Sequence, residues 1–295
     1  MELKKFWVKN YKSLHDVVLE FPVKRTLVIG PSGSGKTALA ETFEILRGAR
    51  PRQATVGIEI VHNGCHVAYE VEGDKEFMLT DCGADEADRI VREFLSKVVV
   101  IKNIDWKAVR SLQPVAETTA LQPDASNAVQ YLYALTGGTI PEPLIAALRY
   151  VFPVKDMWFV DDGGVLLLKL VAENGMTLTQ ATMPSGVLKT LIIETALMAN
   201  PTMLIIDDFE CCLDPETQQF IMDEVRSHGV YAILTTHSAV AVDYAKTPKE
   251  VVMLYLAEGK TKAWRFGEEV EERLRDSRLT LSELIGSGLL EPPSF

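Results

Sequence analysis

The sequence predicts a mixed α/β fold with a mostly parallel central sheet, an N-terminal antiparallel β lobe and a helical subdomain. Two patterns favour this fold: hairpins crowd the first hundred residues, and apolar strands alternate with helices in the second half. A glycine-rich loop at residues 30–37 also follows a strand and precedes a helix, as a phosphate-binding loop does. We therefore expect a P-loop fold.

The elements of the first half lead to this loop and away from it. Residues 2–9 and 17–23 form a predicted hairpin, and the strand RTLVIG enters the loop. A helix is expected over about residues 38–47. In IEIVHNGCHVAYEVE, Asn63-Gly64 separates alternating apolar residues, which is the strongest short signal of a hairpin. Helical spacing over 85–97 then precedes VVVIKN, a strand of the buried type.

The second half alternates helices and strands. Residues 125–152 are predicted to be helical, with a break at the Gly137-Gly138 and Pro141–Pro143 segments, and VLLLKLVA is a strand after an Asp161–Gly164 turn. The remaining elements are helix 186–198, strand MLIIDD, helix 215–227, strand YAILTTHS, hairpin 251–266 and a charged helical tail from Glu268.

We expect one domain over residues 1–295, and four segments divide it. They are a β-rich lobe with the phosphate loop (1–100), a helical insert (101–172), a lobe of alternating strands and helices (173–267) and a C-terminal helical tail (268–295).

The composition argues against some classes of binding partner. The net charge of −11 and the pI of about 5.0 oppose non-specific binding to nucleic acid or anionic membrane. No run of 18 apolar residues occurs, so membrane insertion is not expected. The four cysteines form no CxxC motif, and the adjacent pair Cys211-Cys212 is badly placed for an ordinary disulfide, so a reducing cytoplasm is expected. His62, Cys65 and His66 bracket the Asn-Gly turn and are interpreted as a hairpin tip.

The loop GPSGSGKT fits the pattern GxxxxGK[ST]. Its glycines let several backbone N–H groups face phosphate oxygens at a helix N-terminus. Lys36 would bridge the β- and γ-phosphates of ATP, and the Thr37 hydroxyl would ligate Mg²⁺. The predicted nucleotide-binding residues are Gly30, Pro31, Ser32, Gly33, Ser34, Gly35, Lys36, Thr37 and Ala38.

Several segments in the right order resemble the ABC-type ATPases. MPSGVLKTLIIETALMANPTMLIIDDFECCLD (183–214) resembles their signature helix, Walker B strand and D-loop without a gap, and LTTHS resembles the switch-histidine segment. Within that superfamily, KNYKSLHDVVLEF, LQPDASNAVQYLYAL and TTHSAVAVDYA resemble segments of the SMC, RecF and OLD group. About 150 residues separate loop and signature, too few for an SMC arm, so the chain resembles a bare head.

The resemblance implies roles for acidic residues and a histidine. Asp207 would hold Mg²⁺, Asp208 would be the general base where the family has glutamate, and His237 would contact the γ-phosphate. Glu210 is an alternative base or a solvated loop acid. Aspartate is one methylene shorter than glutamate, and a displacement of about 1 Å can cost ~10²-fold in rate, so slow hydrolysis is expected.

The signature and the Q-loop depart from the family pattern. Pro184 lies where the family has its signature serine, so Ser185 and the backbone at Gly186 would meet the γ-phosphate of a second subunit. Ser185 as a plain helix N-cap is the alternative. The Q-loop residue would be Asn103 or Lys102.

The resemblance implies an Mg·ATP-binding head that dimerises head-to-tail on ATP, acts in DNA maintenance or anti-invader defence, and works with a separate nuclease or effector. The alternatives are a transporter nucleotide-binding subunit, a small-molecule P-loop kinase and a non-hydrolysing nucleotide-binding scaffold. DNA would contact local cations, which are Lys4, Lys5, Lys9, Lys12, Lys24, Arg25, Arg47, Arg50 and Arg52.

Overall fold

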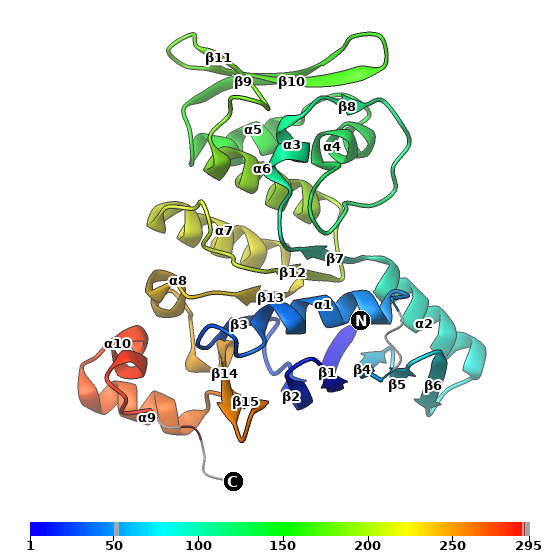
Figure 1. Ribbon diagram of the computed structural model, residues 1–295, viewed down its shortest axis with the longest axis vertical. Helices are drawn as coiled ribbons and strands as arrows, with labels where there is room; N and C mark the ends of the chain where they lie inside the picture. Colours follow the sequence, from blue (N-terminus) through cyan, green and yellow to red (C-terminus); the bar gives the residue numbers. More distant parts are fainter. Residues whose placement is uncertain (50–52, 291, 293–295) are drawn as a thin grey trace.

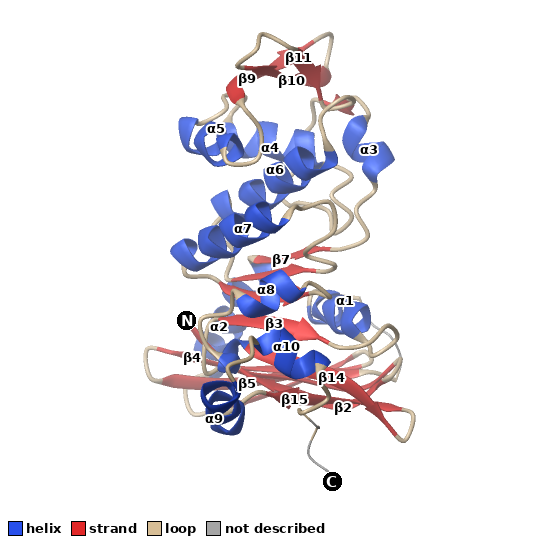
Figure 2. Cartoon of the chain, turned by 90° about the vertical axis from the view of Figure 1, so that its left-hand side faces the viewer, coloured by secondary structure: helices blue, strands red, loops and turns tan. Residues whose placement is uncertain are grey.

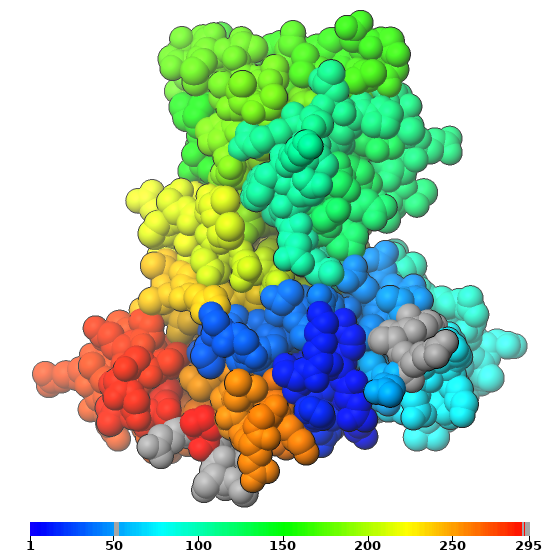
Figure 3. Space-filling model, in the orientation of Figure 1, coloured from blue at the N-terminus to red at the C-terminus, as the bar shows by residue number. Residues whose placement is uncertain are grey.

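The computed structural model describes residues 1–49, 53–290 and 292. A β-rich base carries the N-terminus and the C-terminal tail, and an upper lobe built from the middle of the chain stands on it (Figure 1). The space-filling view shows the upper lobe joined to the base through the segments near residues 200–240 (Figure 3).

The described residues of the base form one eleven-stranded sheet in the order β6-β5-β4-β1-β2-β15-β14-β3-β13-β12-β7. The run from β14 to β7 is parallel, and the run from β6 to β2 is antiparallel. The predicted combination of a parallel core and an N-terminal antiparallel lobe is therefore confirmed. The strands are β1 (Glu2–Tyr11), β2 (Leu14–Glu20), β3 (Arg25–Ile29), β4 (Thr55–His62), β5 (Cys65–Glu72), β6 (Lys75–Thr80), β7 (Val98–Ile101), β12 (Met203–Ile206), β13 (Tyr231–Thr235), β14 (Val251–Ala257) and β15 (Lys260–Arg265).

Two hydrophobic cores lie on opposite faces of this sheet, because side chains alternate along each strand. In β3, Val28 packs into one core, whereas Leu27 and Ile29 pack into the other. The first core is covered by α1 (Lys36–Leu46) and α2 (Ala84–Ser96). Helix α1 therefore follows the glycine-rich loop, as predicted, and packs against the sheet that carries this loop.

The upper lobe contains helices and a second sheet. The described residues of this sheet form β8 (Gln113–Pro114), β9 (Val154–Asp161), β10 (Val165–Ala172) and β11 (Thr177–Thr179), which lie above the helices (Figures 1 and 2). The helices are α3 (Trp106–Arg110), α4 (Ala128–Thr136), α5 (Glu142–Arg149) and α6 (Ser185–Met198). Of these strands only β10 was predicted, because β9 lacks regular alternation of buried and exposed residues and β8 and β11 are short.

The remaining helices flank the parallel core. They are α7 (Pro215–His228), α8 (Ala239–Asp243), the 3₁₀ turn η1 (Pro248–Glu250), α9 (Glu268–Ser277) and α10 (Leu281–Gly286). Ser282 anchors the tail on α8, since its N–H and its hydroxyl both donate to the Asp243 carboxylate at 2.7 Å. Across the described residues, the structure has no helix with the length and apolarity needed to span a bilayer.

One sequence prediction at a turn can be compared with the backbone directly. Asn63 and Gly64 both have positive φ, 51° and 82°, as an Asn-Gly hairpin turn requires. The hairpin prediction is therefore confirmed. Strand β6 was not predicted, because its residues are mostly exposed and show no buried face.

Candidate functional site

The glycine-rich loop connects β3 to α1 and has a backbone that other residues rarely adopt. Gly30, Gly33 and Gly35 have φ values of 148°, 81° and 97°. A Cβ on Gly30 would lie 2.2 Å from the Leu254 carbonyl oxygen, and a Cβ on Gly35 would lie 2.9 Å from Leu14 Cδ2. Glycine is required at both positions, because β14 and β2 pack directly against the loop.

Lys36 curls back over the loop. Its Nζ donates to the carbonyl oxygens of Gly30 at 2.8 Å and Pro31 at 3.2 Å, and the residue is 6% exposed. Burial lowers the pKa of Lys36, while Asp208, Asp207 and Glu210 oppose this shift in that order. The ammonium group therefore lies within electrostatic reach of the acidic residues that follow β12.

Asp207 and Asp208 follow β12 at the end of the parallel core. Asp207 is 6% exposed, and its Oδ1 accepts a hydrogen bond from Thr235 Oγ1 at 2.5 Å. The Asp208 N–H donates to the same Thr235 oxygen at 2.9 Å. Thr235, which the sequence analysis did not single out, therefore fixes both aspartates to the neighbouring strand β13.

Asp208 is held in an unusual conformation. Its φ of 47° lies in the left-handed region, which is costly for a non-glycine residue. Burial raises its carboxyl pKa, and Asp207 and Glu210 raise it further, whereas His237 and Lys189 lower it. The side chain is nevertheless exposed, so it is accessible to a ligand at the loop.

Glu210 and His237 are connected. Glu210 Oε2 accepts from Thr236 Oγ1 at 2.7 Å, and its Oε1 accepts from the His237 backbone N–H at 2.8 Å. Both carboxylate oxygens of Glu210 are thus engaged in holding the segment that presents His237. Glu210 is half-buried and hydrogen-bonded, so the interpretation of Glu210 as a solvated loop acid is wrong. The His237 residue is exposed beside a cavity of about 300 Å³, which Gly30 and Pro31 also line.

The signature-like segment begins α6. Pro184 is the N-cap and Ser185 is the first helical residue, so the alternative in which Ser185 caps the helix is wrong. Arg110 on α3 holds this segment: its Nη1 donates to the Ala181 and Met183 carbonyls at 3.1 and 2.7 Å, and its Nη2 donates to Ser185 Oγ at 2.9 Å.

Gly186 lies against the D-loop-like segment. A Cβ at this position would come within 2.8 Å of the Cys212 carbonyl oxygen. The first turn of α6 therefore packs closely on the chain that follows Asp208, and glycine permits that approach.

The two candidate Q-loop residues differ in their surroundings. Lys102 forms an ion pair with Glu44 on α1, with Nζ and Oε2 2.9 Å apart. Asn103 has a φ of 47° and lines a cavity of about 200 Å³ together with Asp207 and Asp208. The structure thus brings Asn103 to the acidic residues and directs Lys102 elsewhere.

The donor set of this site fits Mg·ATP. The loop has glycines where a Cβ would collide with neighbouring chains, and Ser34 Oγ is buried with no hydrogen-bond partner among the described residues. Thr37 is half-buried in the first turn of α1, beside the N–H groups of the helix start, and Ala38 follows it. The Thr37 hydroxyl and the Asp207 carboxylate are oxygen ligands of the kind that Mg²⁺ prefers.

Sequence reasoning missed Lys189 and Arg110. Lys189 is 2% exposed in α6, and its Nζ donates to the Asp208 carbonyl oxygen at 2.7 Å. A single lysine within the apolar run LKTLIIETALM was a signal that could have found it. No sequence pattern indicated Arg110, because its contacts lie about 70 residues away in the chain.

Four of the six N-terminal cations proposed to contact DNA have acidic neighbours. Lys4 pairs with Glu2, Lys5 with Glu20, Lys12 with Glu41 and Arg25 with Glu250. Lys24 donates to the Gly229 carbonyl at 2.7 Å. Arg47 is exposed, and Arg50 and Arg52 lie outside the described residues. The N-terminal part of the predicted patch is therefore largely neutralised.

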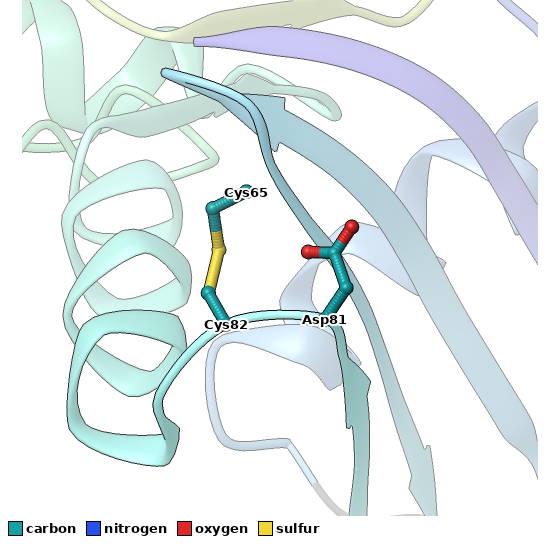
Figure 4. A group of neighbouring side chains, drawn as sticks. All are labelled: Cys65, Asp81 and Cys82. Atoms are coloured by element: carbon teal, nitrogen blue, oxygen red, sulfur yellow. A yellow bond between two sulfur atoms is a disulfide. The ribbon is translucent and has the colours of Figure 1, made fainter.

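A second cluster lies away from the phosphate loop. Cys65 on β5 and Cys82 after β6 form a disulfide, with Cα atoms 5.6 Å apart, and Asp81 lies beside it (Figure 4). Because the two sulfur atoms are bonded to each other, neither cysteine is a thiolate that could ligate a metal ion. The sequence analysis did not predict this pair, because only the β5–β6 hairpin brings Cys82 back to Cys65. A disulfide is more typical of an oxidising compartment than of the expected reducing cytoplasm.

No protein-family model matches the sequence, and no curated protein matches it. Among solved structures, the chain is similar to an SMC head bound to the C-winged helix domain of ScpA, with a TM-score of 0.64 and 13% identity over 90% of this chain and 98% of that one. It is also similar to the SMC head domain from Thermotoga maritima, with a TM-score of 0.56 and 15% identity over 90% of this chain and 100% of that one.

A third similar structure is a Pyrococcus furiosus Smc head with an extended coiled coil bound to the C-terminal domain of ScpA. Its TM-score is 0.64 at 12% identity, over 94% of this chain and 99% of that one. At these identities the similarity shows the fold. The chain therefore has the P-loop fold of the SMC head domains.

Proposed function

We propose that this chain is an ATPase head that binds Mg·ATP, hydrolyses it slowly and dimerises head-to-tail when ATP is bound. One observation carries the proposal: His237 from the end of β13 lines a cavity together with Gly30 and Pro31 of the glycine-rich loop, and Lys36 of that loop lies within electrostatic reach of the acidic residues after β12. These groups come from segments far apart in the sequence, and the fold that the chain shares with the SMC heads supports the proposal.

Each residue has a role in this proposal. The loop backbone and Lys36 bind the phosphates, and Thr37 and Asp207 hold Mg²⁺, which supplies charge neutralisation when bound. Asp208 orients the attacking water and accepts its proton, and His237 donates to the γ-phosphate. Asn103 is the Q-loop residue, since it lines the cavity with both aspartates.

The signature-like segment supports a dimer. None of the described residues 183–186 lines either of the two cavities beside the loop and the aspartates. The start of α6 carries helix N–H groups and the Arg110 guanidinium, both suited to an anion. We propose that these groups meet the γ-phosphate bound to a second copy of the chain.

The test uses Asp208, because its base role and the dimer are linked. Asp208→Asn should bind ATP with wild-type affinity, lose single-turnover hydrolysis by roughly 10²-fold or more, and shift from monomer to dimer in sedimentation with Mg·ATP. Asp208→Glu should raise the rate. Normal turnover by Asp208→Asn removes the base assignment, and a monomer at saturating ATP removes the dimer.

A non-hydrolysing scaffold is the second candidate. Asp208 is one methylene shorter than the glutamate of the family, and Pro184 stands where the family has its signature serine. A scaffold would bind ATP and dimerise without measurable turnover in wild type and in Asp208→Glu.

The biological setting is a proposal from resemblance to the RecF, OLD and SMC group. We propose a role in DNA maintenance or anti-invader defence with a separate nuclease or effector protein, as two of the similar SMC heads are bound to ScpA. Direct DNA binding would depend on Arg47, Arg50 and Arg52, because the N-terminal cations are mostly paired. Duplex affinity with and without ATP at two salt concentrations, for wild type and the triple alanine variant, decides between DNA and a protein partner.

A further inference from the structure

A buried lysine on α6 contacts the segment that carries the proposed base. Lys189 is 2% exposed, and its Nζ donates to the Asp208 carbonyl oxygen at 2.7 Å. It lines the same cavity of about 200 Å³ as Asp207, Asp208 and Asn103. The ammonium group is therefore at the site, although it comes from the signature-like helix.

The hydrogen bond from Lys189 is made to a residue with a costly backbone conformation. Asp208 has a φ of 47°, which for a non-glycine residue persists only when neighbouring groups hold it. On its N-terminal side, Thr235 Oγ1 accepts the Asp208 N–H. On its C-terminal side, the Asp208 carbonyl accepts from Lys189 Nζ and from the Cys211 N–H at 3.0 Å. Lys189 thus supplies a side-chain restraint on Asp208 from α6.

The same helix begins at the signature-like loop. Lys189 follows Ser185 by four residues, which is about one helical turn. Ser185 is fixed by Arg110, and Gly186 packs against the Cys212 carbonyl. A displacement of the first turn of α6 would therefore be transmitted to Asp208 through Lys189, because helices move as rigid units over such short lengths.

We propose that Lys189 is a positioning residue that holds Asp208 in its working conformation and links the signature-like loop of a subunit to the base of that same subunit. The proposal rests on the proposed ATPase function. In the dimer, a signature-like loop that contacts the partner's nucleotide would set the geometry of Asp208 in its own subunit. The two sites would therefore hydrolyse ATP in a coordinated way.

Folding does not account for this lysine. Its amine is removed from water, and among the described residues no carboxylate pairs with it at 4.0 Å or less. Burial lowers the pKa of Lys189, which is the signature of a cation that the fold disfavours. Removing an unpaired buried charge removes a desolvation cost, so an apolar side chain of similar size need not destabilise the fold.

The experiment compares Lys189→Met, Lys189→Arg and the matched control Thr190→Val in the full chain. Thr190 is the next residue of α6, and its buried hydroxyl has no hydrogen-bond partner among the described residues. Each protein is tested for ATP affinity, thermal stability, turnover, and amide hydrogen exchange at Asp208 and Phe209.

Lys189→Met should keep its ATP affinity and lose no thermal stability, while kcat falls by roughly 10- to 100-fold. Exchange at Asp208 and Phe209 should accelerate, and Lys189→Arg should recover part of the rate. Thr190→Val should match wild type in every measurement.

Wild-type rates and exchange in Lys189→Met would overturn the inference, as would a loss of stability that accounts for its loss of activity. Absence of turnover in wild type would instead overturn the proposed hydrolysis. In that case the hydrogen exchange at Asp208 and Phe209 alone decides whether Lys189 positions this segment.

Discussion

Two helices of this molecule begin at a loop suited to an anion, and the two loops are built differently. The loop before α1 has glycine at its N-cap, with no side-chain cap among the described residues, and its glycines adopt positive φ. The loop before α6 has proline at its N-cap, and Arg110 already donates hydrogen bonds to two of its carbonyls and to Ser185.

The two loops differ in where their positively charged side chain comes from. The α1 loop has its cation, Lys36, and its backbone geometry within one short segment. The α6 loop takes its cation from α3, which lies in the upper lobe, and its helix connects through Lys189 to Asp208. The first loop therefore has the groups of the proposed phosphate site within one segment, whereas the second depends on the assembly of the upper lobe against the core.

The largest expected effect is at Lys36. Lys36→Ala removes charge-assisted hydrogen bonds to phosphate worth about 3 kcal/mol, which corresponds to about a hundredfold weaker Kd for ATP. Calorimetric titration with Mg·ATP measures it. The exposed Lys260 at the start of β15 provides a control, since Lys260→Ala should bind as wild type. Equal affinities in the Lys36 variant and wild type would show that the α1 loop is not the phosphate site.

The next prediction distinguishes two effects of an added Cβ in the loop before α1, which are backbone strain and steric collision with β14. Gly30→Ala places a Cβ 2.2 Å from the Leu254 carbonyl oxygen, whereas at Gly33 no described atom lies within 4 Å of the added Cβ. Both positions have positive φ, so each substitution costs about 1–3 kcal/mol in strain. We expect Gly30→Ala to lose more than tenfold in ATP affinity and Gly33→Ala to lose clearly less. The reverse order would mean that β14 does not pack against the loop.

A smaller effect is expected at Arg110. Arg110→Met removes three hydrogen bonds that fix the α6 loop, so ATP-dependent dimerisation should weaken by about tenfold, while ATP binding by the monomer is unchanged. Sedimentation in the Asp208→Asn background measures the dimer. Arg149, whose Nε donates to the Val154 carbonyl in the same lobe, gives the control Arg149→Met. A dimer unaffected by Arg110→Met would remove this arginine from the interface.

The smallest effect is expected at Ser185. Its hydroxyl accepts from Arg110, so Ser185→Ala removes one hydrogen bond worth about 1 kcal/mol. Dimerisation should weaken by roughly fivefold, less than in Arg110→Met. A larger loss in Ser185→Ala than in Arg110→Met would indicate that the hydroxyl, and not the guanidinium, meets the partner's nucleotide.

Local sequence signals determined much of this protein. The phosphate loop, its flanking strand and helix, the Asn63-Gly64 hairpin and the strand that ends at Asp207 were predicted, because glycine conformations and apolar periodicity act over a few residues. Asp208 and His237 became candidates through the resemblance to the ABC-type ATPases. They missed β8, β9 and β11, since short strands and irregular alternation carry little local information.

The tertiary structure decided which of these groups meet. Thr235 binds both aspartates across 27 and 28 residues, Lys189 reaches Asp208 across 19, and Arg110 reaches Ser185 across 75. The choice of Asn103 over Lys102, the engagement of Glu210 and the Cys65–Cys82 disulfide arose in the same way. Such contacts depend on strand order and helix packing, because residues distant in the chain become neighbours only when the sheet and the upper lobe have formed.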